Sequence, residues 1–75
     1  MNQKEFIELI KRKRLSQMLS QKDVAKSIPI SKTAYSKIEN HQQNLSFFMI
    51  RRLAELFDID LNIIKEASKD IVFYD

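Results

Sequence analysis

One stretch of the sequence, residues 32–40, carries side chains whose types and spacing suit contact with nucleic-acid bases. If this stretch is helical, its basic and uncharged polar residues recur at positions i, i+1, i+4, i+5 and i+8 and share one face. These residues are Lys32, Thr33, Ser36, Lys37 and Asn40. Lysine can donate to guanine, a threonine methyl can meet a thymine methyl, and asparagine can pair with adenine or contact a phosphate. The pattern favours a helix in the major groove of DNA, with a merely solvated face as the alternative.

Short helices with polar capping residues are predicted to position this face. The spacing of apolar residues predicts helices over about 3–16, 21–27, 32–40, 47–57 and 61–67. Their predicted N-caps are Asn2, Ser20, Ser31, Ser46 and Asp60. The fold class is therefore all-α with five helices. The domain spans residues 1–67, followed by a short C-terminal tail, 68–75, that is predicted to be extended.

Three of these helices are expected to contact their neighbours in particular ways. The pair within 21–40 can cross closely, because Ala25 and Ser36 near the crossing are small. The helix over 47–57 is expected to bury a stripe of five apolar residues. They are Phe47, Ile50, Leu53, Ala54 and Phe57.

The composition limits the classes of function. With no cysteine and one histidine, His41, the chain lacks the usual zinc ligands and shows no nucleophile with a base partner. Glycine is absent, which excludes glycine-rich phosphate-binding loops. We therefore expect no enzyme activity, metal or cofactor, and His41 is expected to be a loop residue near the DNA backbone. No apolar run approaches the roughly 20 residues that span a bilayer, so we expect a cytoplasmic protein that does not bind membranes.

Charge is divided unevenly along the chain. Residues 1–40 hold nine basic and four acidic side chains, whereas residues 41–75 hold four basic and six acidic ones. A basic half beside an acidic half indicates that the first half faces a polyanion.

Four segments, taken together, resemble the phage-repressor helix-turn-helix family of the Cro/cI or Xre type. They are residues 10–14 (IKRKR), 19–25 (LSQKDVA), 31–40 (SKTAYSKIEN) and 53–57 (LAELF), and they keep the family's spacing over residues 10–64. The resemblance implies a five-helix bundle that binds double-stranded DNA with the unit at about 21–40 and regulates transcription.

The resemblance also implies roles for individual residues. Lys32, Thr33 and Lys37 would reach base edges, with Ser31 and Ser36 beside them on the DNA-binding surface. Gln21 would touch a phosphate and brace the recognition helix, since a helix N-terminus offers free N–H groups to an anion. Asn40 and Asn44 would contact the DNA backbone. Arg14 and Glu39 would form a structural ion pair that holds helix 32–40 against helix 3–16.

Three residues depart from the family pattern. Pro29 stands in the turn where relatives commonly have a left-handed glycine. Proline fixes φ at about −65°, so we expect an earlier end to helix 21–27 or a changed angle to the next helix. Met18 replaces another common glycine, and Leu45 stands where many relatives have proline.

Apolar residues near the C-terminus predict a homodimer. Exposed strand-prone segments often mark pairing sites, and the candidate interface residues are Ile59, Ile63, Ile71 and Phe73. Two arrangements stay open: helix 61–67 packing on its twofold mate, or the tail crossing to the partner as an extended strand. A tail that folds back on its own first helix is the alternative.

The leading hypothesis is a homodimeric repressor that binds a palindromic operator. An antitoxin or a controller of a restriction system would use the same domain, with a toxin or other protein as partner. A third hypothesis is a protein–protein interaction module that recruits a partner through the tail. That module would show no salt-sensitive DNA binding.

Overall fold

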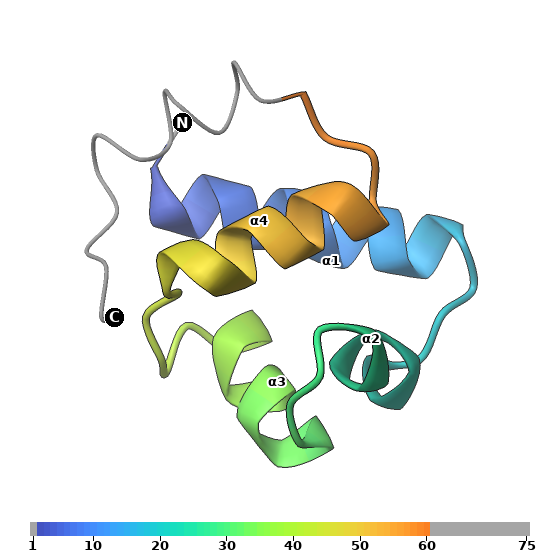
Figure 1. The fold of residues 1–75 in the computed structure, drawn as a ribbon, viewed down its shortest axis with the longest axis horizontal. Coiled ribbons are helices and arrows are strands. Elements are labelled where there is room, and N and C mark those ends of the chain that lie inside the picture. Colours follow the sequence, from blue (N-terminus) through green and yellow to red (C-terminus); the bar gives the residue numbers. More distant parts are fainter. Residues whose placement is uncertain (1, 61–75) are drawn as a thin grey trace.

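The computed structural model describes residues 2–60, which form four helices and no strand (Figure 1). The helices are α1 (Gln3–Ser16), α2 (Gln21–Ser27), α3 (Lys32–Glu39) and α4 (Phe47–Leu56). The all-α prediction is confirmed, and each of these helices ends within one residue of its predicted bounds. The described chain has four helices where five were predicted. The fifth predicted helix (61–67) and the tail (68–75) lie outside the described residues.

Each described helix begins at a polar residue whose side chain caps it. The caps are Asn2, Ser20, Ser31 and Ser46, each of which accepts a hydrogen bond from the backbone N–H three residues further on. In α1 and α2 the capping is reciprocal, with Glu5 and Asp23 as the returning acceptors. The Ser20 backbone N–H donates to the Asp23 carboxylate at 2.9 Å and thereby lowers the pKa of that group. These local hydrogen bonds explain why the helix starts follow from sequence.

The helix ends show how a chain without glycine leaves a helix. The residues that follow the C-caps of α1, α3 and α4 are left-handed: Met18 (φ 58°), His41 (φ 59°) and Asp58 (φ 53°). After α1, the N–H groups of Met18 and Leu19 donate to the carbonyls of Leu15 and Arg14, both at 3.0 Å. The ends of α3 and α4 repeat this pair of bonds, which is the Schellman arrangement usually built on glycine.

The turn between α2 and α3 differs because of Pro29. Proline has no N–H, so one of the two closing bonds is missing, but the Ile30 N–H still donates to the Ala25 carbonyl at 2.8 Å. Pro29 is not left-handed, and α2 ends at Ser27 through Ile28 (φ −99°, ψ 17°). The helix therefore keeps its predicted length, and the bond from Ile30 closes the turn without glycine.

Substitution of Met18 by glycine is expected to stabilise the protein by up to about 1 kcal/mol. The left-handed conformation costs a residue with a Cβ atom roughly 1–2 kcal/mol, and the added freedom of glycine in the unfolded chain offsets part of that gain. Met18 is 92% exposed, so its substitution removes little packing. Urea unfolding measures the effect, with Met18→Ala as the control that removes the side chain but keeps Cβ. Equal midpoints for the two variants would contradict this explanation.

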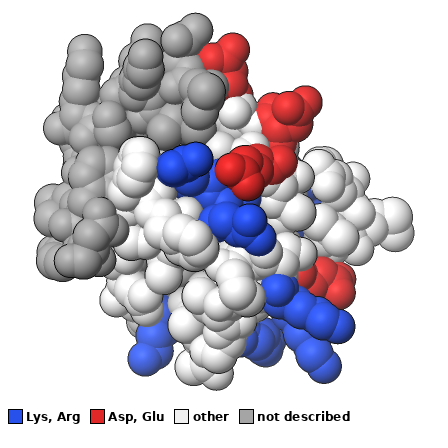
Figure 2. Space-filling model, in the orientation of Figure 1, with Lys and Arg blue, Asp and Glu red and all other residues white. Residues whose placement is uncertain are grey.

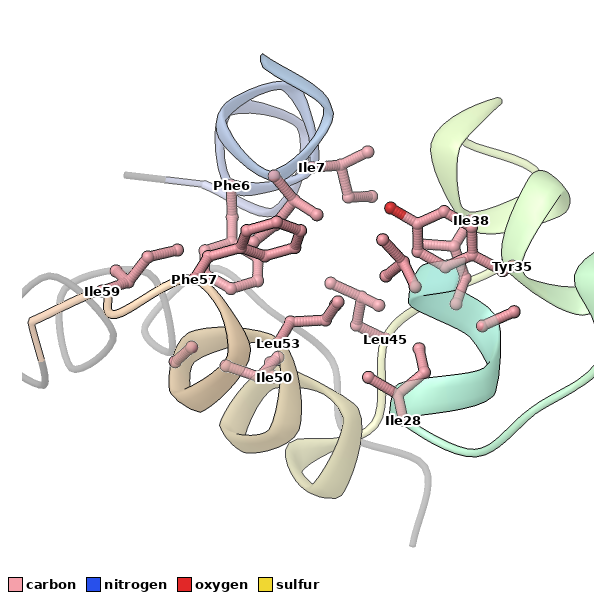
Figure 3. Packing of buried hydrophobic residues seen from close by; sticks show 14 residues of the cluster. Phe6, Ile7, Ile28, Tyr35, Ile38, Leu45, Ile50, Leu53, Phe57 and Ile59 are labelled. Carbon is pink, nitrogen blue, oxygen red and sulfur yellow. The ribbon is translucent and has the colours of Figure 1, made fainter. Parts of the chain in front are cut away.

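Among residues 2–60, fourteen buried apolar residues form one core (Figure 3). Phe6 of α1 points toward Phe57 and the α4 side of the core, whereas Ile7 points toward Tyr35 of α3. The core residues are Phe6, Ile7, Ile10, Val24, Ala25, Ile28, Tyr35, Ile38, Leu45, Ile50, Leu53, Ala54, Phe57 and Ile59. Within residues 2–60, no helix is both long and apolar enough to cross a membrane.

Leu45, one of the three departures from the family pattern, has a structural role that proline could not fill. Its side chain is fully buried in the core, and its backbone N–H donates to Gln3 Oε1 at 3.3 Å. Proline has no N–H and could not form this bond between the α3–α4 loop and α1.

Candidate nucleic-acid interface

Helix α3 packs one face on the core and presents the other to solvent. Tyr35 and Ile38 point inward and are almost completely buried. The outward positions are Lys32, Thr33, Lys37 and Asn40, which are exposed, and Ser36, which is half-buried. The one acidic residue of α3, Glu39, lies on the buried side. In Figure 2, Lys and Arg side chains gather along the lower part of the molecule, over α2 and α3. The exposed face of α3 thus carries positive charge and neutral hydrogen-bonding groups.

A buried ion pair fixes the end of α3 against α1. Arg14 Nε lies 2.7 Å from Glu39 Oε2, and Arg14 Nη2 lies 2.9 Å from Glu39 Oε1, so the contact is bidentate. The remaining terminal nitrogen, Nη1, donates to the Leu19 carbonyl at 2.9 Å. Arg14 is 8% exposed and Glu39 is 2% exposed. One guanidinium therefore joins the end of α1, the loop before α2 and the end of α3.

Gln21 also contacts this pair. Its side-chain amide nitrogen donates to Glu39 Oε1 at 3.1 Å, so the first residue of α2 binds the last residue of α3. This contact fits the bracing role that the resemblance implied for Gln21. Ser31, also predicted to lie on the DNA-binding surface, precedes α3 and is exposed. Its hydroxyl oxygen caps the helix by accepting a hydrogen bond from the Ala34 N–H at 3.0 Å.

The environment of Glu39 keeps it ionised. Burial by itself would raise the pKa of this carboxyl, but hydrogen bonds from Arg14 and Gln21 and the neighbouring Tyr35 hydroxyl outweigh burial and lower it. The same contact with Glu39 raises the pKa of Arg14, although burial acts in the opposite direction. Both groups are charged at neutral pH, and each charge is stabilised mainly by the opposite charge of its partner.

The Tyr35 hydroxyl lies beside this ion pair but forms no hydrogen bond with it. It is buried and has no partner among the described residues. Burial raises the pKa of the phenol, and the neighbouring Glu39 carboxylate raises it further. Tyr35 therefore contributes mainly its ring to the core.

Besides the Leu45–Gln3 bond, two side-chain contacts hold the loop after α3 to α1, and sequence reasoning did not find them. The Gln3 side-chain amide donates to Asn44 Oδ1 at 3.0 Å, and His41 Nε2 lies 2.9 Å from Glu8 Oε2. Asn44 and His41 are both exposed, at the end of α3 and in the loop that follows. The partners are 41 and 33 residues apart in sequence, and no local spacing signals such a pairing.

Phe47 does not join the buried stripe of α4 as expected. It is 43% exposed, and the Arg51 guanidinium lies over its ring at 5.8 Å from the centroid. The prediction was wrong for Phe47 because the first turn of α4 extends past the core, whereas Ile50, Leu53 and Ala54 further along are buried.

Of the predicted dimerisation residues, only Ile59 lies in the described part. It is 9% exposed and belongs to the core cluster, close to Phe57 (Figure 3). Ile63, Ile71 and Phe73 lie outside the described residues.

This geometry can be compared with known proteins. The Helix-turn-helix family matches residues 10–64, from the middle of α1 to beyond the end of α4. The chain is a helix-turn-helix protein of the Cro/cI (Xre) type. It is also similar to the ImmF control region 10 kDa protein of Bacillus phage phi105, with 38% identity over 64 residues. Those residues cover 85% of this chain and 71% of the relative. No solved structure matches the chain.

Membership makes this helix-turn-helix protein a DNA-binding regulator. The helix pair that gives the family its name corresponds to α2 and α3, which are joined by the turn at Pro29. The two exposed lysines of α2, Lys22 and Lys26, were not among the predicted site residues. Their spacing of four residues places them on one side of the helix, and this signal was not used in the sequence analysis.

Proposed function

We propose that this protein is a homodimeric transcriptional repressor that reads a palindromic operator with α3 in the major groove. The observation that carries the proposal is the exposed face of α3, which has no acidic group and is held from behind by Arg14, Glu39 and Gln21. A recognition helix must present its side chains in one fixed orientation to discriminate bases. The buried network supplies that orientation.

In this proposal the exposed residues divide by role. Lys32, Thr33 and Lys37 contact base edges, because they occupy the first two turns of α3 on its solvent side. Ser31, Ser36, Gln21, Asn40 and Asn44 position the helix on the sugar–phosphate backbone. The phage relative is named for a control region, which supports a regulatory role for this chain too.

Dimerisation is assigned to the segment that begins near Ile59. A repressor monomer reads one half-site, and a twofold dimer reads two half-sites about one DNA turn apart, or roughly 34–36 Å. Ile59 already packs in the monomer core, so the proposed interface rests mainly on residues beyond it, including Ile63, Ile71 and Phe73.

Selection of DNA fragments on the full chain tests this function. We expect enrichment of one sequence with twofold symmetry, protection of both half-sites in footprinting, and two chains per duplex in analytical ultracentrifugation. The same measurements on a chain that ends at residue 68 test the interface, because removal of the tail should weaken the dimer. No enriched sequence, or a single chain on an asymmetric site, would contradict the proposal.

A further inference from the structure

The end of α2 is held by a side chain from α4. Arg52 Nη2 donates to the carbonyl oxygen of Ser27, the last residue of α2, at 3.0 Å. The start of α2 is held as well, because Gln21 donates to Glu39 of α3 at 3.1 Å. Sequence reasoning did not point to Arg52, since it lies 25 residues from Ser27. The helix α2 is thus fixed to α3 at its start and to α4 at its end.

This end of α2 has fewer closing backbone hydrogen bonds than the ends of the three other described helices. After α1, α3 and α4, two consecutive N–H groups donate back to carbonyls of the helix. After α2, the first of these two positions is Pro29, which has no N–H, so the Ile30 N–H alone donates back, to the Ala25 carbonyl at 2.8 Å. Carbonyls at a helix C-terminus carry partial negative charge, which a cation stabilises. By binding Ser27, Arg52 adds a hydrogen bond from another helix at the turn where Pro29 removes one.

The turn at Pro29 sets the direction in which α3 leaves α2. Helix α3 begins three residues later, and its exposed first turn carries Lys32 and Thr33. A change in this turn would therefore move both side chains relative to α2. Arg52 does not belong to the exposed face of α3, because it projects from α4. The hollow that it borders is lined by α4 residues alone, namely Phe47, Phe48, Arg51, Arg52 and Glu55.

We propose that Arg52 is a positioning residue for DNA recognition, which holds the turn at Pro29 in the conformation that directs α3 at the bases. This inference rests on the proposed function. A hydrogen bond can shift the equilibrium between two arrangements of a turn by no more than its own net free energy, which corresponds to about a two- to tenfold change. The affinity for the operator falls by the same factor when the competent arrangement becomes less populated.

The test compares Arg52→Met with Arg51→Met in binding to the selected operator and to random duplex. Both variants remove one positive charge from the same part of α4, but Arg51 contacts Phe47 of its own helix. We expect Arg52→Met to bind the operator about two- to tenfold more weakly, whereas Arg51→Met should bind it nearly as the parent does. Binding to random duplex should change little. The slope of log K against log salt should also stay unchanged, because loss of a direct phosphate contact would lower its magnitude by about 0.9.

Hydrogen exchange measures the turn in the free protein. The Ile30 amide hydrogen is bonded to the Ala25 carbonyl, and its exchange should accelerate in Arg52→Met by about the same two- to tenfold factor. The Leu19 amide, which closes the end of α1, should keep its rate. In a Pro29→Gly background a second N–H can close the turn. Arg52→Met should therefore cost less operator affinity there than beside Pro29.

The outcomes separate this inference from the proposed function. If the parent protein selects an operator, three results overturn the inference: equal operator affinities of Arg52→Met and Arg51→Met, a salt slope lowered by about 0.9, or an equal loss in the Pro29→Gly background. If the parent protein selects no operator, the repressor proposal fails, and exchange at Ile30 decides whether Arg52 holds the turn. Equal acceleration at Ile30 and Leu19 would overturn that role too.

Discussion

Substitution of Glu39 by alanine is expected to lower the free energy of unfolding by about 3–5 kcal/mol. The cost arises because Arg14, which is 8% exposed, would remain charged and buried without its bidentate partner. Small domains of this size have only about 5–15 kcal/mol in total. Urea unfolding at neutral pH measures the change, and Arg14→Ala is expected to show a decrease of the same order.

A double-mutant cycle shows whether the two residues act as a pair. The double alanine variant should be destabilised by much less than the sum of the two single effects, because no unpaired charge remains. Arg14→Met/Glu39→Leu provides a variant that folds if either single variant does not, since apolar replacement of a buried pair is often neutral. Tyr35→Phe is the control beside the pair, and removal of its hydroxyl should cost less than either single alanine substitution, because the ion pair itself is kept. Additive single effects would show that Arg14 and Glu39 do not interact.

The Arg14–Glu39 pair also makes the free energy of unfolding depend on pH. Because the folded pKa of Glu39 is lowered, its contribution is complete above the ordinary glutamate pKa of about 4.3. That contribution is lost as pH falls through the lowered pKa of the folded state. Below about pH 4, the unfolding free energy of Glu39→Gln should therefore fall less steeply than that of the parent protein.

Substitution of Lys32 or Thr33 by alanine is expected to weaken binding to the selected operator by about 1–3 kcal/mol each. The reason is that each side chain is exposed on the first turn of α3, where it is free to meet a base and contributes little to the core. The effect on random duplex should be much smaller. Equilibrium binding on both DNAs measures the difference, and unfolding curves check that stability is unchanged.

Thr33 provides the sharper comparison because it carries no charge. Thr33→Ser keeps the hydroxyl and removes the methyl group, while Thr33→Val keeps the shape and removes the hydroxyl. If a thymine methyl is the partner, the serine variant should bind the operator more weakly than the valine variant. Equal effects on operator and random DNA would reassign Lys32 and Thr33 to backbone contacts.

The parts of this structure that depend on near neighbours in sequence were predictable. Ser20 and Ser31 indicate helix starts because each caps an N–H only three residues away. The outward face of α3 follows from helical spacing in the same way. Phe47 was placed wrongly because its exposure depends on where the core ends, which is a property of the whole bundle.

The contacts that hold α3 and the following loop against α1 were harder to predict from sequence. The pairing of Arg14 with Glu39 came from family resemblance, since nothing local links residues 25 positions apart. The contact of Gln3 with Asn44 and Leu45 was not predicted at all.

The buried and the exposed sides of α3 can change independently during evolution. Tyr35, Ile38 and Glu39 are committed to the core and the ion pair, whereas Lys32 and Thr33 are exposed to solvent. Exposed substitutions of this kind usually change stability by no more than about 0.5 kcal/mol. Under the proposed function, a lineage can therefore exchange the outward residues one at a time, and change its operator, without passing through an unfolded intermediate. Divergence of operator preference among close relatives is open to selection as soon as the buried half of the helix is in place.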